Sequence, residues 1–301
     1  MIFTNVQKII CTAKEYFARP EISNSGLGTL ALSPSLFRDE QEGVYARAET
    51  SAMRLGSAFD CFLLTPDEFT EGYATEPAEF EVPTTPMQHK FVNLLAEGVG
   101  EKEARERAGY KKASVTADQY KNHLGFCALA KDNGLIVLTT DEMTQISAMA
   151  NAVAVDGYAT QAVRDSEKQV VLVGTHEGTG IRMKCMIDMI AHEGSYIQMD
   201  DLKTTSKNRA GFFYAYRDYG YDRQGAIYGS MAGAFYSLPV HHGILAVGKD
   251  PIWCQLFDVD DHIEKGEEKA EFLLRSLDWH QRSGYWENTR EYKENEGRIR
   301  L

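Results

Sequence analysis

Hydrophobic and polar positions along the chain predict a helical first half and a mixed α/β second half. Apolar residues at helical spacing in SNSGLGTLALS and SAMRLGSAFDCFLL favour helices within residues 1–70. The stretch 71–86 holds three prolines and no regular period, so we expect a loop or an edge element there. Three more helices are expected after it, at about 87–108, 113–130 and 140–164.

A different pattern begins in the second half, where apolar segments of strand length follow one another. The segments 168–175, 180–191 and 195–205 are separated by HEGTG and HEGS, whose residues favour tight turns, so we expect an antiparallel meander. A helical segment at about 207–237 comes next, followed by strands in HHGILAVGK and PIWCQLFDV and by a terminal helix. The expected order of this part is therefore β-β-β-α-β-β-α.

These elements fit one α/β domain that spans residues 1–301. The length of 301 residues, with 43% hydrophobic and 25% charged residues, is typical of an ordinary globular protein. We expect a mostly helical N-terminal part (1–165), the β-β-β-α-β-β-α core (166–285) and a C-terminal tail (286–301).

Apolar runs, cysteines and net charge indicate the cellular location of the protein, the state of its thiols and the charge of its surface. No run of about 18 apolar residues exists and the N-terminus does not resemble a signal peptide, so we expect a cytoplasmic protein with no membrane contact. The five cysteines are scattered without a CxxC pair, which favours reduced thiols and disfavours disulfides or a zinc site. The formal net charge of −12 argues against a uniformly basic surface but allows a local basic groove.

Charged residues gather at the end of the third predicted strand, in QMDDLKTTSK. Asp201 and Lys203 are two residues apart and share a strand face, whereas Asp200 points the other way. The preceding strand carries Asp188 on the face of Lys184, and a turn near residues 193–195 would bring Asp188 beside Asp201. Two neighbouring carboxylates repel unless a proton or a cation joins them, and Mg²⁺ prefers such oxygen ligands. A structural ion pair with Lys203 would explain the same spacing.

The helix expected after this strand carries polar and aromatic residues where a core helix would carry leucine and valine. These residues alternate in spacing between three and four, so they share one helix face; they are Tyr214, Arg217, Tyr221, Gln224 and Tyr228. Their donor groups suit phosphate oxygens, although a helix packed through its tyrosine rings is the alternative. Further basic residues make the segment locally positive: Lys207, Arg209 and Arg223.

The order of these motifs resembles a known nuclease family. The run from MKCMIDMIAHEGSYIQMDDLKTT to YDRQGAIYGSMA is similar to the catalytic core of RecE-type exonucleases, which belong with phage lambda exonuclease to the PD-(D/E)XK superfamily. The family pattern is an aspartate on one strand, D-x-K-T-T on the next and Q-x-x-x-Y on the following helix. It is matched in order and spacing by Asp188, Asp201, Lys203, Gln224 and Tyr228.

Two N-terminal motifs extend the resemblance. EYFARPEISNSGLGTLALSPSLF is similar to the opening of the family, and AMRLGSAFDCFLLTPDEF resembles its next helix. In that helix Asp60 stands where many relatives have histidine, and Ile187 replaces a proline before the first aspartate. Glu167 lies at a recurrent acidic position of the first core strand.

The resemblance implies a restriction-endonuclease-like core, with a central mixed sheet flanked by helices and an N-terminal helical lobe. It implies Mg²⁺ as cofactor, with Mn²⁺ as a substitute, held by Asp188, Asp201 and the Leu202 carbonyl. Glu167 or Asp60 are further candidate ligands. In the family's scheme Lys203 activates or positions the attacking water, and Gln224 and Tyr228 shape the site or hold the DNA backbone. Candidate DNA contacts are Arg217, Tyr221, Lys207 and Arg223.

The activity implied is an exodeoxyribonuclease that digests one strand of linear double-stranded DNA from its ends, 5′ to 3′, for recombination. The implied partners are double-stranded DNA ends, a single-strand annealing recombination protein and further copies of the chain in a ring trimer or tetramer. A phage-encoded protein would act in the host cell cytoplasm. Two alternatives are an endonuclease on the same core and a non-catalytic DNA-binding protein that retains the fold.

Overall fold

The structure is a computed structural model that describes residues 1–46, 48, 50–111 and 114–299. The chain forms two compact units, one made of residues 1–56 and 149–301 and the other of residues 57–148. Within the described ranges, no helix combines the length and the apolar character needed to cross a bilayer. All five cysteines are free thiols, in agreement with the prediction.

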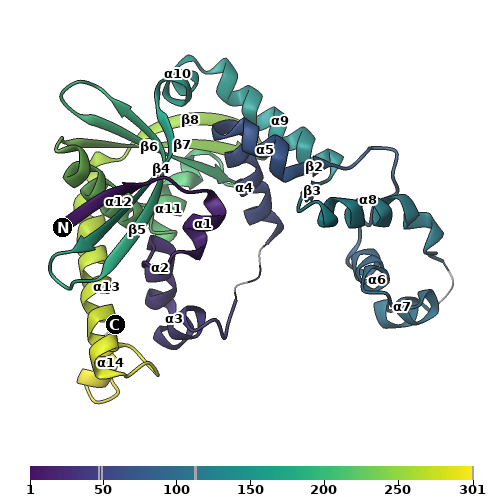
Figure 1. Ribbon diagram of the computed structural model, residues 1–301, viewed down its shortest axis with the longest axis horizontal. Helices are drawn as coiled ribbons and strands as arrows, with labels where there is room; N and C mark the ends of the chain where they lie inside the picture. The colour runs from purple at the N-terminus through teal and green to yellow at the C-terminus, as the bar shows by residue number, and fades with distance from the viewer. Residues whose placement is uncertain (47, 49, 112–113, 300–301) are drawn as a thin grey trace. The chain divides into compact units, whose positions relative to one another are not determined.

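A six-stranded mixed sheet forms the centre of the first unit (Figure 1). Its strand order is β1-β4-β5-β6-β7-β8, and every neighbouring pair is antiparallel except β6 and β7, which are parallel. The strands are β1 (Phe3–Ile9), β4 (Glu167–His176), β5 (Arg182–His192), β6 (Ile197–Thr205), β7 (Val240–Lys249) and β8 (Ile252–Asp258). The predicted meander and the predicted mixed sheet are both confirmed.

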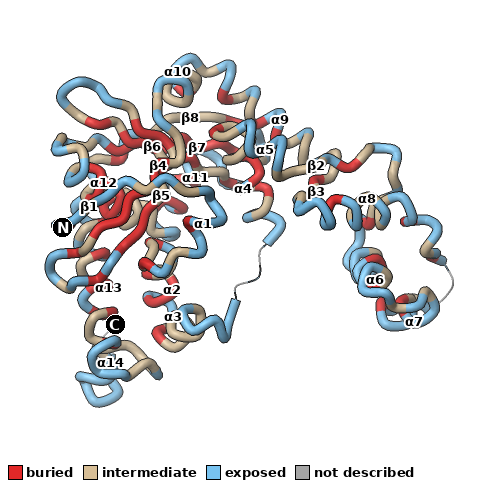
Figure 2. The backbone as a smooth tube through the Cα atoms, in the orientation of Figure 1, coloured by how far each residue is buried: buried red, intermediate tan, exposed pale blue. Residues whose placement is uncertain are grey.

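Helices cover the sheet and complete the core of this unit. Their bounds are α1 (Ala13–Ala18), α2 (Asn24–Leu32), α3 (Pro34–Gln41), α10 (Gly157–Asp165), α11 (Arg209–Asp218), α12 (Tyr221–Tyr236), η2 (Asp260–His262), α13 (Ile263–Ser283) and α14 (Arg290–Glu294). Side chains of α2, α12 and α13 pack with the sheet in one apolar cluster, which includes Leu27, Met231 and Leu274. Figure 2 shows the buried residues in red along the strands of this sheet.

Two features of this unit differ from the prediction. Residues 3–9 were expected to be helical, but they form β1, because their backbone pairs with β4, which lies far along the chain. The single helix expected at 207–237 is two helices, because Gly220 takes a left-handed conformation with φ of 68° and separates α11 from α12. A glycine adopts that conformation without the clash that a Cβ would cause.

The second unit is mainly helical and has a small core of its own. Helices α4 (Ser51–Leu64) and α9 (Thr140–Val155) each have residues in both units. The remaining elements are α5 (Pro66–Gly72), β2 (Tyr73–Thr75), α6 (Pro86–Ala96), α7 (Glu101–Ala108), η1 (Asp118–Tyr120), α8 (Lys121–Asp132) and β3 (Ile136–Leu138). Strands β2 and β3 pair in parallel, and the core gathers around Phe91 and Tyr120.

Candidate active site

Asp188 and Asp201, the two aspartates singled out by the sequence, lie where strands β5 and β6 separate. The strands pair from His192 opposite Ile197 up to Met189 opposite Asp200, and their ladder ends there. Asp188 and Asp201 are the next residues on either strand, so they flank the opening of the fork. The turn therefore brings the two residues together in the way that the sequence predicted.

The N-terminal segment occupies the edge of β5 beyond the fork. Ile22 forms a parallel bridge to Met183, in which the Ile22 N–H donates to the Arg182 carbonyl at 3.0 Å and the Lys184 N–H donates to the Ile22 carbonyl at 2.9 Å. The buried Lys184 ammonium donates to the Tyr16 carbonyl at 2.9 Å. The segment around Ile22, and not β6, therefore pairs with β5 beyond the fork, so the two strands remain apart at the two carboxylates.

The alternation of side chains along β5 breaks between Ile187 and Ile190. Met183, Cys185 and Ile187 lie in the main apolar cluster, and so does Ile190, although strict alternation would put Ile187 and Ile190 on opposite faces. The side chain of Asp188 lies in the fork, because its Oδ2 accepts the Leu202 N–H at 2.9 Å. The alternation of Met183, Cys185 and Ile187 in this cluster continues up to Asp188, so the predicted face shared with Lys184 stays a prediction.

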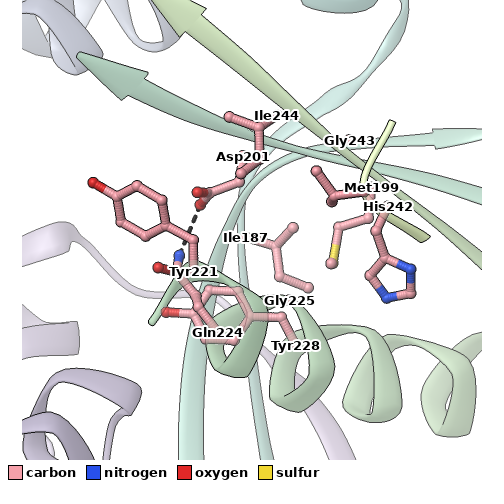
Figure 3. Close-up of a pocket in the computed structure, with 11 residues that line it drawn as sticks. Ile187, Met199, Asp201, Tyr221, Gln224, Gly225, Tyr228, His242, Gly243 and Ile244 are labelled. Atoms are coloured by element: carbon pink, nitrogen blue, oxygen red, sulfur yellow. Dashed lines mark hydrogen bonds between the residues drawn. The ribbon is translucent and has the colours of Figure 1, made fainter. Parts of the chain in front are cut away.

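Asp201 is held by two donors that come from different elements. Lys203 forms an ion pair with Oδ2, and the Gln224 side-chain amide of α12 donates to Oδ1 at 2.8 Å (Figure 3). The side chains of Asp201 and Lys203 are only 15% and 18% exposed. The Lys203 ammonium also lies 5.1 Å from the centre of the Tyr221 ring.

The electrostatics of the fork keep Lys203 positively charged. Burial lowers the pKa of Lys203, but the nearby carboxylates of Asp201 and Asp188 outweigh burial and hold the pKa above its ordinary value. An ammonium can donate hydrogen bonds to water or phosphate, but it cannot accept a proton.

The donor atoms at the fork fit a hard divalent cation. Asp188 and Asp201 supply carboxylate oxygens, and the Leu202 carbonyl lies on the same side of the strand as the Leu202 N–H that contacts Asp188. Each carboxylate oxygen has a second lone pair besides the one that accepts the observed hydrogen bond. In the part of the chain that the structure describes, no three His, Cys, Asp or Glu side chains converge on one point. Two carboxylates and a backbone carbonyl are oxygen donors of the kind that hard divalent cations take, together with water.

One residue of this site was not predicted, and it lies opposite Asp188. Gln169 sits between two register pairs, Lys168 with Met189 and Val170 with Ile187, so it faces Asp188 across β4 and β5. Its side-chain amide donates to Asp188 Oδ1 at 3.4 Å. Its backbone has φ of 51°, a left-handed conformation that is unusual for a residue with a Cβ. The sequence offers only one signal, a polar residue that interrupts an apolar strand.

Other predicted residues take different positions. Glu167 is half exposed and forms an ion pair with Lys8 of β1, and it is Gln169, not Glu167, that faces Asp188. Arg223 donates through Nε to the Asn24 side chain at 2.8 Å, so it links α12 to α2 and is not a free phosphate contact. Asp60 lies on α4 in the second unit, and its proposed role stays a prediction.

The predicted tyrosine and arginine positions divide between surface and interior. Tyr228 is buried and lines the small cavity next to Asp201, so it shapes the site from beneath. Arg217 and Lys207 are exposed on the segment that follows β6. Because α11 and α12 are separate helices, Tyr214 and Arg217 do not form one continuous stripe with Gln224.

The space next to Asp201 is too small for a small-molecule substrate. The cavity beneath it has a volume of about 20 Å³, room for a single water, and its wall includes Ile187, Met199, Tyr228 and His242 (Figure 3). Asp188 and Lys203 are not part of its wall; they lie with Asp201 where the ladder of β5 and β6 ends.

Comparisons with known proteins agree with this geometry. A solved structure named as a "Putative exonuclease" from Eubacterium rectale is 15% identical, covers 97% of this chain and 95% of that chain, and has a TM-score of 0.57, which shows a shared fold. The structure of SSO0001 is 13% identical over 70% of this chain and 85% of that chain, but its TM-score of 0.24 supports no argument. No curated protein matches the sequence. The family described as "PDDEXK-like domain of unknown function (DUF3799)" matches residues 23–279, so the chain belongs to the PDDEXK-like domain family.

Proposed function

We propose that this protein is a metal-dependent deoxyribonuclease that digests linear double-stranded DNA from its ends. The observation that carries the proposal is the fork itself, where two aspartates and one lysine converge and the Gln224 amide donates to one of the carboxylates. Membership of the PDDEXK-like family supports phosphodiester hydrolysis. The exonuclease name of a structural neighbour supports action at DNA ends.

The residues of the fork suit the steps of phosphodiester hydrolysis. A bound divalent cation would polarise the scissile phosphate and lower the pKa of a water molecule. Asp188 and Asp201 would hold that cation, each carboxylate being fixed by a backbone or amide donor. Lys203 would donate hydrogen bonds to the attacking water and to the charge that develops on phosphate.

The distribution of charge around the site favours a polymeric anion as substrate. The chain has a net charge of −12, so its overall field disfavours loose association along the sides of DNA. Exposed basic residues nevertheless follow the catalytic strand directly, at Lys207, Arg209 and Arg217. A local basic surface in an acidic protein suits a confined contact, such as the one that a DNA end would make.

Cleavage of end-labelled linear duplex, compared with covalently closed circular DNA, tests the proposal. With Mg²⁺ the linear duplex should be degraded while the circles stay closed, and chelator should stop the degradation. Nicking or linearisation of circles as fast as linear DNA disappears would favour the endonuclease alternative. Binding without any metal-dependent cleavage would favour the non-catalytic alternative.

Adjacent aspartates provide a matched pair of variants for the same assay. Asp201→Asn removes a carboxylate of the fork and should abolish cleavage. Asp200→Asn is the control, because Asp200 is buried on the opposite face, where it accepts from Gln198 at 2.9 Å and packs against Gly243. Equal loss in the two variants would show that the effect is structural and would remove Asp201 from the mechanism.

Finer features of the proposal rest on the resemblance to RecE-type exonucleases. They are Mg²⁺ as the physiological cation, 5′-to-3′ polarity, a role in recombination beside a single-strand annealing protein, and a ring trimer or tetramer. Strand-specific labels at either end of the duplex test the polarity. Sedimentation of the free protein tests the ring.

A further inference from the structure

Helix α11 has an exposed face that combines aromatic rings with arginines. Its inner face, which includes Phe212, Ala215 and Tyr216, is buried against Trp253 and its neighbours. Phe213 and Tyr214 point outward and remain 49% and 69% exposed. Exposed rings of this size are unusual on a helix whose other side already supplies the core contacts.

Arginines flank these rings at helical spacing. Arg209, Phe213 and Arg217 are four residues apart and therefore share one face of α11, with Tyr214 beside them. The Arg209 guanidinium lies 5.4 Å from the centre of the Trp253 ring, which holds the first arginine against the protein surface. The face thus presents two cations and two rings within about three helical turns.

A chain of close contacts leads from α11 to the catalytic fork. Tyr219, which follows α11, is 61% exposed, and its ring lies 5.8 Å from the ring of Tyr221. The Tyr221 ring lies 5.1 Å from the Lys203 ammonium, and Lys203 forms the ion pair with Asp201. A ligand that stacks on Tyr219 would therefore lie close to the scissile position.

We propose that the outer face of α11, together with Tyr219, binds unpaired nucleotides at a DNA end by stacking their bases. The inference rests on the proposed nuclease function and specifies its substrate as an end with a single-stranded or frayed segment. Aromatic rings bind bases of any sequence, and the interleaved arginines suit the phosphates between them. A second copy of the same face is disfavoured as the occupant, because like charges would meet across the interface.

Equilibrium binding of two fluorescent probes tests this inference, with Ca²⁺ in place of Mg²⁺ to prevent cleavage. One probe is a blunt duplex and the other is the same duplex with a thymidine overhang. The wild-type protein should bind the overhang probe more tightly. Tyr214→Ala and Tyr219→Ala should each weaken overhang binding about tenfold, the effect of losing one stacked base, and should change blunt binding by less than about twofold.

Conservative variants and a surface control separate stacking from other effects. Tyr214→Phe and Tyr219→Phe keep the ring and should restore overhang binding. Tyr158→Ala is the control, since Tyr158 is 81% exposed on α10 of the same unit and is not part of α11. Circular dichroism should show that all variants remain folded.

Each contrary result points to another role for the surface. Equal weakening of both probes would make α11 a general duplex contact and overturn the stacking inference. Unchanged binding with a shift from oligomer to monomer in sedimentation would make the face an interface between copies, which also overturns it. If the wild-type protein binds the overhang as expected but never cleaves DNA with Mg²⁺, the nuclease proposal fails while the stacking surface stands.

Discussion

Replacing Gln169 with glycine should separate the stability of the protein from its activity. Gln169 has φ of 51°, and the flanking pairs of Lys168 with Met189 and Val170 with Ile187 prevent its backbone from relaxing. Its amide contributes the long 3.4 Å hydrogen bond to Asp188. Gln169→Gly therefore removes two things at once, the strain of a left-handed residue with a Cβ and the second donor to a site carboxylate.

The two effects on folding nearly cancel. Left-handed backbone in a residue other than glycine costs about 1–2 kcal/mol, which the variant recovers. Against this stand about 1 kcal/mol for the lost hydrogen bond and about 0.5–1 kcal/mol for the greater freedom of glycine in the unfolded chain. We expect the free energy of unfolding to change by less than about 1 kcal/mol. Gln169→Ala, which loses the amide but keeps the strain, should be about 1 kcal/mol less stable than Gln169→Gly.

Activity should change much more than stability. Groups that orient a metal ligand typically contribute about 10–100-fold to cation affinity or rate, so Gln169→Gly should lower both by at least about tenfold. Calorimetric titration with Mg²⁺ and cleavage of linear duplex measure these effects, and urea denaturation in chelator measures stability. Ser237→Gly is the matched control, because Ser237 has φ of 56° at the far end of α12. It should gain stability and keep full cleavage.

Two outcomes would refute this account of Gln169. If Gln169→Ala is as stable as Gln169→Gly, the backbone at this position is not held in the left-handed region in solution. If Gln169→Gly binds Mg²⁺ and cleaves DNA like the wild type, the amide does not position Asp188.

Three further predictions concern charge and packing near the site. Lys203→Met leaves two carboxylates without their counter-ion, so without metal it should lose about 2–3 kcal/mol of stability, and Mg²⁺ should restore more stability to it than to the wild type in thermal denaturation. Gly229→Ala should destabilise by about 1–3 kcal/mol, because a Cβ would lie 2.0 Å from His242 Nε2; unchanged urea denaturation would contradict this contact. Burial raises the pKa of Asp260, but hydrogen bonds from His242 and His241 outweigh it and lower that pKa. This carboxylate therefore stabilises the fold above its unfolded pKa and stops doing so as the pH falls through its lowered folded pKa, and Asp260→Asn should flatten the acid side of the stability profile.

The sequence predicted the parts of the site that depend on local order. The pairing of β5 with β6 follows from a short turn, so strand length and side-chain alternation sufficed to bring Asp188 and Asp201 together. The motif spacing likewise located Lys203 and Gln224. The strand pairing and the motif spacing both depend on the order of residues along the chain, which a sequence pattern describes directly.

The features that the sequence did not predict depend on contacts between distant segments. Gln169 faces Asp188 only through the register across β4 and β5, and the alternation of β5 breaks beyond Ile187, where Ile190 joins the same apolar cluster. The charge of Arg223 suits a phosphate contact, but its guanidinium donates to Asn24 of α2 and so links two helices within the protein. Strand β1 is defined by a partner that no local pattern identifies.

Strand β1 has a consequence for how the protein avoids aggregation. It covers the edge of β4, whose segment from Val170 to Val173 is buried and would otherwise offer a row of open backbone groups to other chains. The new outer edge is itself a poor template, because its register shifts between Thr4 and Gln7 and Asn5 takes a left-handed conformation with φ of 52°. A chain shortened by its first nine residues would thus expose the unpaired backbone groups of β4, which other chains could pair with. We therefore expect the irregular N-terminal strand to protect the concentrated protein from edge-to-edge assembly into sheets.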